Sequence, residues 1–247
     1  MTPDTEHSSS SWESQPDPSV LPGESAVVVQ DIVLSLDSGA GVIPILQGIS
    51  FTVPRQQLQF LMGPSGSGKT TLLQILAGFL RPTSGDVQLL GQSLNCLTNA
   101  QLTQFRLRHL GFIFQHFNLF PALNAEENVA LALQIKGVRK RELKERAIAL
   151  LNQVGMAHKA DRLPRDLSGG EQQRVAIARA LAGDPEIIMA DEPTAALDSA
   201  NGRVVIDLLR DRVVQSGATV LIVTHDFRLL DKHDRVLFLE DGKLLNV

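Results

Sequence analysis

The sequence predicts an α/β fold built on a mostly parallel sheet with helices on both faces. In the last third of the chain, the apolar runs PEIIMADE, ATVLIVTHD and DRVLFLEDGKLL alternate with the helical pattern NGRVVIDLLRDRVVQSG. Apolar strands that alternate with helices are typical of parallel sheets. Earlier, the apolar run LQFLM leads into a glycine-rich loop and then into the helical pattern TTLLQILAGFL. Because ligands of such sheets bind at the carboxyl ends of the strands, we expect the functional residues there.

The chain has 247 residues, a length that fits one large domain or a domain with an inserted subdomain. Its 43% hydrophobic and 20% charged residues are typical of a soluble globular protein. The formal net charge of −4 gives no electrostatic reason to expect nucleic acid as a partner. The single cysteine, Cys96, excludes an intrachain disulfide framework. We expect no membrane span, because no run of about eighteen apolar residues occurs.

The first residues, 1–25, are rich in Ser, Pro, Asp and Glu, and we expect a disordered tail there, with the folded domain over 26–247. Two β-branched runs follow, AVVVQDIVLSL and ILQGISFTV, separated by the glycine-bearing segment DSGAGVIP. They predict paired strands. After the glycine-rich loop and its helix, SGDVQLLGQSL predicts a further short strand between two turns. Together these segments predict an antiparallel β subdomain.

A helical subdomain is expected as an insertion at about 95–165. The run QLTQFRLRHLGFIFQ passes from a helical pattern into an apolar strand-like run that ends at Gln115. After it, EENVALALQIKG and KRELKERAIALLNQVGM predict amphipathic helices. The charged run at 139–146 is either a partner site or a solvated helix face, and we favour the solvated face because opposite charges alternate in it.

The glycine-rich loop fits the phosphate-binding pattern G-x-x-x-x-G-K-[ST] at every defined position. Glycines allow successive backbone N–H groups to face a polyphosphate, and the helix that follows points its positive N-terminal end at the same charge. We expect Lys69 to reach the β- and γ-phosphates and Thr70 to bind a magnesium ion. A Gly/Ser turn with a chance lysine is the disfavoured alternative. The expected nucleotide contacts in this loop are Gly63, Pro64, Ser65, Gly66, Ser67, Gly68, Lys69, Thr70 and Thr71.

The apolar run IIMADE ends in two adjacent carboxylates, Asp191 and Glu192. We expect Asp191 to hold the magnesium ion, directly or through water, and Glu192 to orient or deprotonate an attacking water. An acidic pair at the end of a strand is common by itself. The phosphate-binding loop upstream is what makes the pair a candidate for catalysis.

The segment LSGGEQQR begins a helix, with Ser168 as its N-cap and Glu171 completing a capping box. Capping alone does not require Gly169 and Gly170, since each glycine costs up to about 1 kcal/mol relative to alanine in a helix. Glycines at a helix N-terminus do allow an anion to approach closely. We therefore favour a second phosphate-contacting surface over a simple helix start.

With these residues, the chain resembles the nucleotide-binding subunits of ATP-binding-cassette (ABC) transporters over about 26–247, which implies a P-loop NTPase core. The resemblance implies that two copies form a head-to-tail homodimer, with ATP between the Walker A motif of one copy and the signature of the other. The matching motifs follow the family's order: GPSGSGKT as Walker A, Gln115 as the Q-loop, LSGGEQQRVAIARAL as the signature, IIMADEP as Walker B, Ala196-Leu197-Asp198 as the D-loop, and His225 as the switch histidine.

By matching position, the resemblance implies that Ser168, Gly169 and Gly170 contact the γ-phosphate in trans. It also implies that Gln115 helps to coordinate magnesium and senses the permease, and that Asp198 belongs to the nucleotide site. The cofactors implied are ATP and Mg²⁺. The implied ligands of the metal are Thr70, Gln115 and Asp191. The expected catalytic residues are Lys69, Glu192 and His225.

Within the family, LGFIFQHFNLFPALNAEENVALAL is most similar to the lipoprotein-releasing and macrolide-exporter type. That similarity implies export through a separate membrane permease, with this chain peripheral on the cytoplasmic face of the inner (plasma) membrane. The apolar side chains of Phe117, Leu119 and Phe120 are expected to form a groove for a coupling helix of the permease. Burial of these side chains inside the helical subdomain is the alternative.

One position departs from the family's pattern. The family usually has an aromatic residue, often Tyr, that stacks on adenine, whereas this chain contains no Tyr and has Leu36 at that place. An aliphatic contact loses aromatic stacking, which puts nucleotide affinity and the preference for ATP over GTP in question.

Two other functions would leave different features in the sequence. A soluble ABC ATPase acting in DNA repair, chromosome organisation or translation predicts a long coiled-coil insertion or two cassettes in one chain, and the sequence contains neither. A regulatory module without hydrolysis is disfavoured because Glu192 and His225 are both in place.

Overall fold

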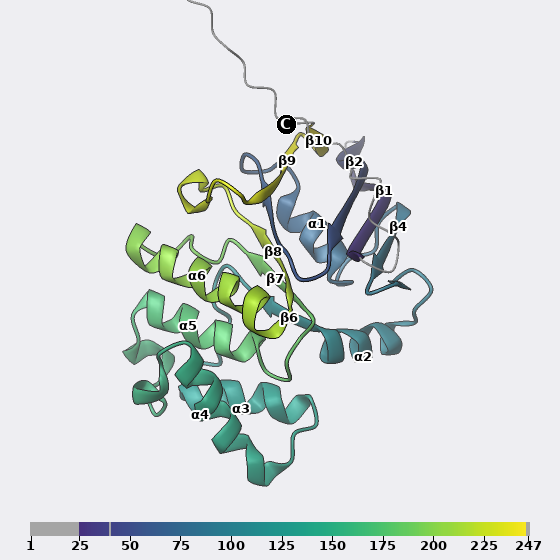
Figure 1. Ribbon diagram of the computed structural model, residues 1–247. Helices are drawn as coiled ribbons and strands as arrows, with labels where there is room; N and C mark the ends of the chain where they lie inside the picture. The colour runs from purple at the N-terminus through teal and green to yellow at the C-terminus, as the bar shows by residue number, and fades with distance from the viewer. Residues whose placement is uncertain (1–24, 40, 246–247) are drawn as a thin grey trace, which may run out of the picture.

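Two sheets form the frame of the fold (Figure 1). The structure, a computed structural model, describes residues 25–39 and 41–245, so the expected tail lies outside the described residues except for Ser25. A four-stranded sheet has the strand order β2-β1-β4-β5, and a six-stranded sheet has the order β10-β9-β3-β8-β7-β6. The strands of the smaller sheet are β1 (Ser25–Ser38), β2 (Gly41–Pro54), β4 (Ser84–Leu89) and β5 (Gln92–Ser93).

The smaller sheet is antiparallel throughout, as the sequence predicts. β1 pairs with β2 from Ser25 opposite Pro54 to Ser38 opposite Gly41. The two strands are longer than expected, because Val42 and Ile43 continue the pairing through most of the segment that the sequence assigned to a turn. β-branched residues favour extended backbone, so the ladder extends almost to the tip of the hairpin.

The larger sheet is mostly parallel, with one antiparallel strand at its edge. All five residues of β7 and of β8 are buried. Ile187 and Met189 of β7 pack in the cluster that contains β1, β2 and the first helix, while Ile188 and Ala190 pack in the cluster on the other face. Burial of both faces explains why these strands are apolar at every position. The strands are β3 (Leu58–Met62), β6 (Leu110–Ile113), β7 (Ile187–Asp191), β8 (Thr219–Val223), β9 (Arg235–Glu240) and β10 (Lys243–Leu245).

Helices cover both faces of the larger sheet, and in Figure 1 α1 lies between it and the smaller sheet while α5 and α6 lie on the opposite side. α1 ends earlier than its apolar pattern predicts, because Gly78 adopts a left-handed conformation with φ 66°. Within the described ranges, none of the helices has the length and hydrophobicity that crossing a membrane requires. The helices are α1 (Lys69–Leu76), α2 (Asn99–His109), α3 (Ala125–Ile135), α4 (Leu143–Gln153), α5 (Gly169–Ala180) and α6 (Ser199–Ser216).

The range expected for the helical subdomain, about 95–165, includes a strand of the larger sheet. β6 follows α2 directly and pairs with β7, from Leu110 opposite Ile187 to Ile113 opposite Ala190. The helices that extend away from the sheet, α3 and α4, come only after this strand (Figure 1). We therefore propose that the inserted subdomain begins after β6. Its division from the rest of the folded domain remains a prediction.

Candidate active site

The phosphate-binding loop lies between β3 and α1, as the sequence predicts. Gly63 and Gly68 have φ angles of 147° and 100°. A Cβ atom on Gly63 would lie 1.9 Å from the carbonyl oxygen of Leu239, and one on Gly68 would lie 2.9 Å from Leu46 Cδ2. Both positions therefore require glycine, for backbone conformation and for the close approach of β9 and β2.

Neighbouring segments hold this loop in a fixed shape. The backbone N–H of Gly242, in the turn between β9 and β10, donates to the carbonyl oxygen of Ser67 at 3.2 Å, and the N–H of Ser67 donates to that of Pro64 at 3.3 Å. The Ser67 hydroxyl oxygen is buried and has no hydrogen-bond partner among the described residues. A buried hydroxyl without a partner is costly in a folded protein, and a phosphate oxygen in the loop would supply the missing acceptor.

Lys69 is buried at the start of α1, with 6% of the residue exposed. Its Nζ donates to the carbonyl oxygens of Gly63 and Pro64, at 2.9 and 2.7 Å, and so lies within the loop. Burial lowers the pKa of Lys69, whereas the charges of Glu192 and Asp191 act in the opposite direction. An ammonium group with little water around it is placed to compensate phosphate charge strongly.

Thr70 and Asp191, which the sequence predicts as magnesium ligands, are in direct contact. The Thr70 hydroxyl donates to Asp191 Oδ1 at 2.9 Å. Burial at the end of β7 raises the pKa of Asp191, the hydrogen bond from Thr70 lowers it, and the charge of Glu192 raises it. A cation in addition to Lys69 would compensate the negative charges of Asp191 and Glu192. Gln115 lies two residues after β6 at the same edge of the sheet and is exposed, with no described hydrogen bond to either residue.

Glu192 and His225, from the carboxyl ends of β7 and β8, form a pair. His225 Nδ1 lies 2.8 Å from Glu192 Oε1. Glu192 has a left-handed backbone with φ 45°, and its N–H donates to the carbonyl oxygen of Val223 at 2.9 Å. With this backbone the Glu192 side chain contacts His225, whereas that of Asp191 contacts Thr70. The pair places a carboxylate and an imidazole beside the phosphate-binding loop, where they could activate a water.

The signature residues begin α5 with the predicted capping box. Ser168 N–H donates to Glu171 Oε2 at 2.9 Å, and Glu171 N–H donates to the Ser168 hydroxyl at 3.4 Å. A Cβ atom on Gly170 would lie 3.2 Å from Asn201 Oδ1. Asp198 caps α6 by accepting from the backbone and side-chain amides of Asn201, at 2.9 and 2.7 Å. Asp198 is thus part of the local structure that supports the signature.

The predicted site residues fall into two groups. The phosphate-binding loop, Asp191, Glu192 and His225 form one group, and Ser168–Gly170 with Asp198 form the other. No hydrogen bond or ion pair connects the two groups among the described residues. The sequence predicted both surfaces, and in the structure they lie on different elements of the chain.

The apolar residues expected to receive a permease helix have three different environments. Phe120 is 52% exposed, whereas Leu119 packs against the core cluster formed with α3 to α5. Phe117 lies against the signature, with its Cζ atom 3.8 Å from where a Cβ atom on Gly169 would be. Of the three, only Phe120 is largely available to a partner. The apolar character of Leu119 is explained by its packing against the core.

Two residues that sequence reasoning missed hold this segment in place. Arg179, near the end of α5, donates to the carbonyl oxygens of Phe117, at 2.6 Å, and Asn118. Burial lowers the pKa of Arg179. Asn128, a polar residue on the buried face of α3, accepts from the N–H of Phe120 at 2.8 Å. An asparagine at an apolar position of an amphipathic helix was the signal that could have identified it.

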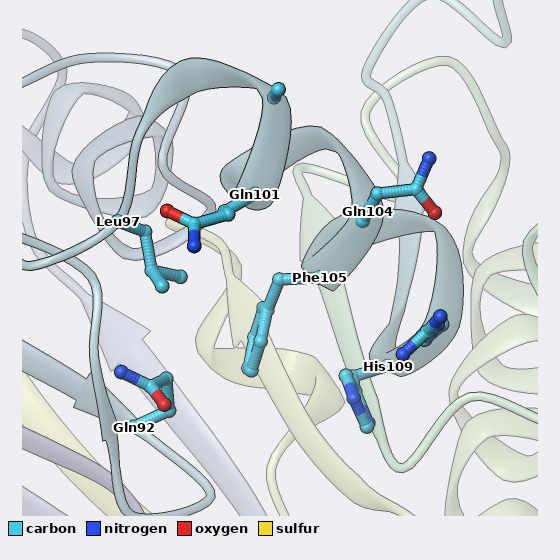
Figure 2. A pocket seen from close by; sticks show the side chains of 8 residues that line it. Gln92, Leu97, Gln101, Gln104, Phe105 and His109 are labelled. Carbon is cyan, nitrogen blue, oxygen red and sulfur yellow. The ribbon is translucent and has the colours of Figure 1, made fainter.

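A separate pocket of about 330 Å³ lies along α2, where Phe105 stands between Leu97 and His109 (Figure 2). Its lining residues include none of the predicted site residues, so its chemistry is separate from that of the phosphate-binding loop. The lining residues are Gln92, Leu97, Ala100, Gln101, Gln104, Phe105, Arg108 and His109.

Comparison with known proteins gives concordant matches. A family model described as ABC transporter matches residues 46–195. The lipoprotein-releasing system ATP-binding protein LolD of Hyphomonas neptunium is 44% identical, covering 85% of this chain and 92% of that protein. The putative hemin import ATP-binding protein HrtA of Staphylococcus haemolyticus is 40% identical, covering 89% and 99%. The dimeric ATP-binding cassette MJ0796 bound to ADP and Pi superposes with a TM-score of 0.82 at 39% identity, covering 88% and 96%.

Proposed function

This chain belongs to the family of ABC transporter ATP-binding proteins, and we propose that it couples ATP hydrolysis to export through a separate membrane permease. Its membership makes it an ABC-type ATPase. The observation that carries the proposal is the division of the site residues into two surfaces that share no hydrogen bond or ion pair among the described residues. The expectation of an antiparallel β subdomain on a P-loop core agrees with this family.

The two separate surfaces support a head-to-tail dimer. The phosphate-binding loop with Asp191, Glu192 and His225 would bind and hydrolyse ATP. The helix N-terminus at Ser168–Gly170 would contact the γ-phosphate of the nucleotide held by the other copy. Such an arrangement gives the second anion-binding surface a use that one isolated chain lacks. The dimeric form of MJ0796 is consistent with it.

Hydrolysis in this site would depend on three residues of the chain. Glu192 would accept the proton of the attacking water, with His225 holding the carboxylate through their 2.8 Å contact and reaching the γ-phosphate. Lys69 would stabilise the negative charge that develops on the transferred phosphate. The loop's backbone N–H groups would hold the remaining phosphate oxygens, because glycines keep that surface open.

The metal ion that the family implies fits the donors present. Thr70 and Asp191 supply oxygen ligands that already contact each other at 2.9 Å, and Gln115 would add a third from the adjacent strand end. Among the described residues, no group of three His, Cys, Asp or Glu side chains could hold a metal by itself. This agrees with Mg²⁺, which typically takes one or two carboxylates and completes its shell with phosphates and water. When bound, Mg²⁺ would supply charge neutralisation at the phosphates.

Export is supported by the relative named as lipoprotein-releasing and by the Q-loop segment, whereas HrtA carries a name that refers to import. The permease would dock at the exposed Phe120, in the segment that follows Gln115, with the chain on the cytoplasmic face of the inner membrane. Transport assays in inside-out vesicles, with the permease that copurifies with this chain, would give the direction. Failure to recover any membrane protein would favour the soluble ABC ATPase.

The catalytic role is tested with Glu192→Gln, which keeps the size of the side chain and removes its ability to accept a proton. We expect turnover to fall about 10²- to 10⁴-fold while ATP accumulates on a dimer, because binding groups are unchanged. Turnover is measured by phosphate release and the dimer by light scattering. Glu186→Gln serves as the control, since Glu186 precedes β7 at its other end and is exposed. Normal turnover in Glu192→Gln would remove Glu192 from the catalytic role.

A further inference from the structure

The signature of this chain contains an acidic residue, and a lysine outside every predicted motif contacts it. Glu171 is the third residue of α5, in the helix turn that begins with Gly169. Lys159 Nζ lies 2.5 Å from Glu171 Oε1, and the Ser168 N–H donates to Glu171 Oε2 at 2.9 Å. Both oxygens of the carboxylate therefore have a donor. Of the two side chains, 33% of Lys159 and 18% of Glu171 are exposed.

Lys159 is held on a rigid turn. It ends the short 3₁₀ helix Ala157–Lys159, where its N–H donates to the carbonyl oxygen of the buried Met156 at 3.0 Å. The neighbouring Ala160 is also buried, and its carbonyl oxygen accepts from the N–H of Glu126 in α3 at 2.9 Å. The backbone that carries Lys159 is thus fixed between α4 and α3. This backbone position places the Lys159 ammonium group at the start of α5, where it contacts Glu171.

A carboxylate at this place creates an electrostatic conflict. Negative charge in the first turn of α5 is favourable for the helix itself. The same charge repels a phosphate group that approaches the N–H groups of Gly169 and Gly170. The hydrogen bond from Lys159, followed by the one from Ser168, lowers the pKa of Glu171. Protonation therefore does not remove the negative charge near neutral pH, and a nearby cation has to compensate it.

We propose that Lys159 is a positioning residue that neutralises Glu171, so that the signature can accept the γ-phosphate of ATP bound by a second copy of this chain. This inference rests on the proposed function, since it concerns the same nucleotide. Lys159 acts through Glu171 and does not touch the phosphate. The pair presents no net charge to the nucleotide while Glu171 retains its capping contacts.

A structural role for the same ion pair makes a different prediction. Partly exposed ion pairs contribute little to stability. Glutamine at position 171 can close the capping box as glutamate does. The variant Glu171→Gln therefore removes the negative charge and keeps the helix cap. If Lys159 serves only to neutralise that charge, it becomes dispensable once residue 171 is glutamine.

The test is a double-mutant cycle with Lys159→Met and Glu171→Gln in the full chain carrying Glu192→Gln, in which the ATP-bound dimer is expected to accumulate. The quantity measured is the ATP concentration at which dimer formation is half-maximal. Light scattering in the presence of MgATP follows the dimer. We expect Lys159→Met to raise this concentration about five- to tenfold when residue 171 is glutamate, because it exposes the phosphate to a carboxylate without its cation. In the Glu171→Gln background, we expect the same substitution to change it by less than about twofold.

Lys144→Met is the matched control, because Lys144 lies on α4, is 80% exposed at its side chain and is 3.8 Å from Glu126. It removes the same charge from the same part of the chain, and we expect no change in the half-maximal ATP concentration. An equal defect from Lys159→Met in both backgrounds, or no defect in either, overturns the inference alone. If the Glu192→Gln chain that carries neither further substitution stays monomeric at every ATP concentration, the proposed function is overturned as well.

Discussion

Leu36 and Ile43 face each other across β1 and β2, with 50% and 49% of their surfaces exposed. Two residues further along β2, the carbonyl oxygen of Ile45 lies 3.2 Å from where a Cβ atom on Gly68 would be. The aliphatic pair is therefore continuous with the strand that packs on the phosphate-binding loop. We propose that it covers the base of the nucleotide by dispersion contacts in place of aromatic stacking.

Leu36→Tyr tests this assignment. We expect ATP to bind about two- to tenfold more tightly, since an aromatic pair contributes about 0.5–1.5 kcal/mol beyond its buried area. Isothermal titration calorimetry of the isolated chain measures the affinity for ATP and for GTP. Val42→Tyr is the control, because the side chain of Val42 points to the opposite face from that of Ile43. Equal tightening by both variants would show that the base lies elsewhere.

At the level of residues, spacing predicted those groups whose partners are close in sequence or fixed by a motif. The phosphate-binding loop needs only its glycines and the flanking strand and helix. Lys159 and Arg179 were not predictable, because their partners, Glu171 and the carbonyl oxygens of Phe117 and Asn118, depend on how α4 and α5 pack. No local pattern marks a lysine or arginine for such a contact.

At the level of elements, α6 holds the segment that follows the switch histidine. Arg210 Nη1 and Nη2 contact Asp234 Oδ1 and Oδ2 at 2.5 and 2.6 Å, and Arg203 contacts Asp231 at 2.5 Å. The hydrogen bond to Asp234, and its charge, raise the pKa of Arg210. α6 begins at the D-loop cap, Asp198, so one helix connects the D-loop with the segment after His225.

Arg210→Met should destabilise the fold by about 1–3 kcal/mol, because it leaves the carboxylate of Asp234 buried without its bidentate partner. Only 7% of the Asp234 side chain is exposed. Urea denaturation followed by circular dichroism measures the loss. Arg228→Met is the control, since Arg228 makes a similar contact to Asp226 with 75% of its side chain exposed, and its loss of stability should be clearly smaller. Equal losses would contradict the role given to burial.

Element boundaries were less predictable than element types. The sequence identified the strand at 58–62 correctly, and β3 has those bounds. It also predicted a strand-like run that ends at Gln115, and β6 (Leu110–Ile113) lies within that run, but the range expected for the helical subdomain included it. Pairing with β7 makes this strand part of the larger sheet, and that pairing joins residues more than seventy positions apart, which no local pattern shows.

At the level of the whole molecule, the proposed dimer makes each ATP site from two chains. The sequence already indicated two phosphate-contacting surfaces, and the fold places them on different elements: the loop follows β3 in the sheet, whereas the signature begins α5, which packs with α3 and α4. A chain with a defective loop should therefore remain able to complete a site on a partner whose loop is intact.

Mixing two inactive variants tests this directly. Lys69→Ala removes the loop lysine, and Gly169→Asp adds a negative charge to the signature, where a Cβ atom has room at 3.4 Å from the carbonyl oxygen of Ala196. Each variant alone should lack turnover. In an equal mixture, half of the dimers are mixed and each of these has one intact site of two, so about a quarter of wild-type turnover should return.

The control for this mixture places both substitutions in one chain and mixes it with wild type. A mixed dimer then has one site with a defective loop and one with a defective signature, so only the wild-type dimers, about a quarter of the total, should keep full turnover. Phosphate release measures both mixtures. If each site were contained within one chain, the two single variants would restore nothing on mixing, and the wild-type chains would keep half of the turnover in the control. That pair of results would exclude a site shared between two copies.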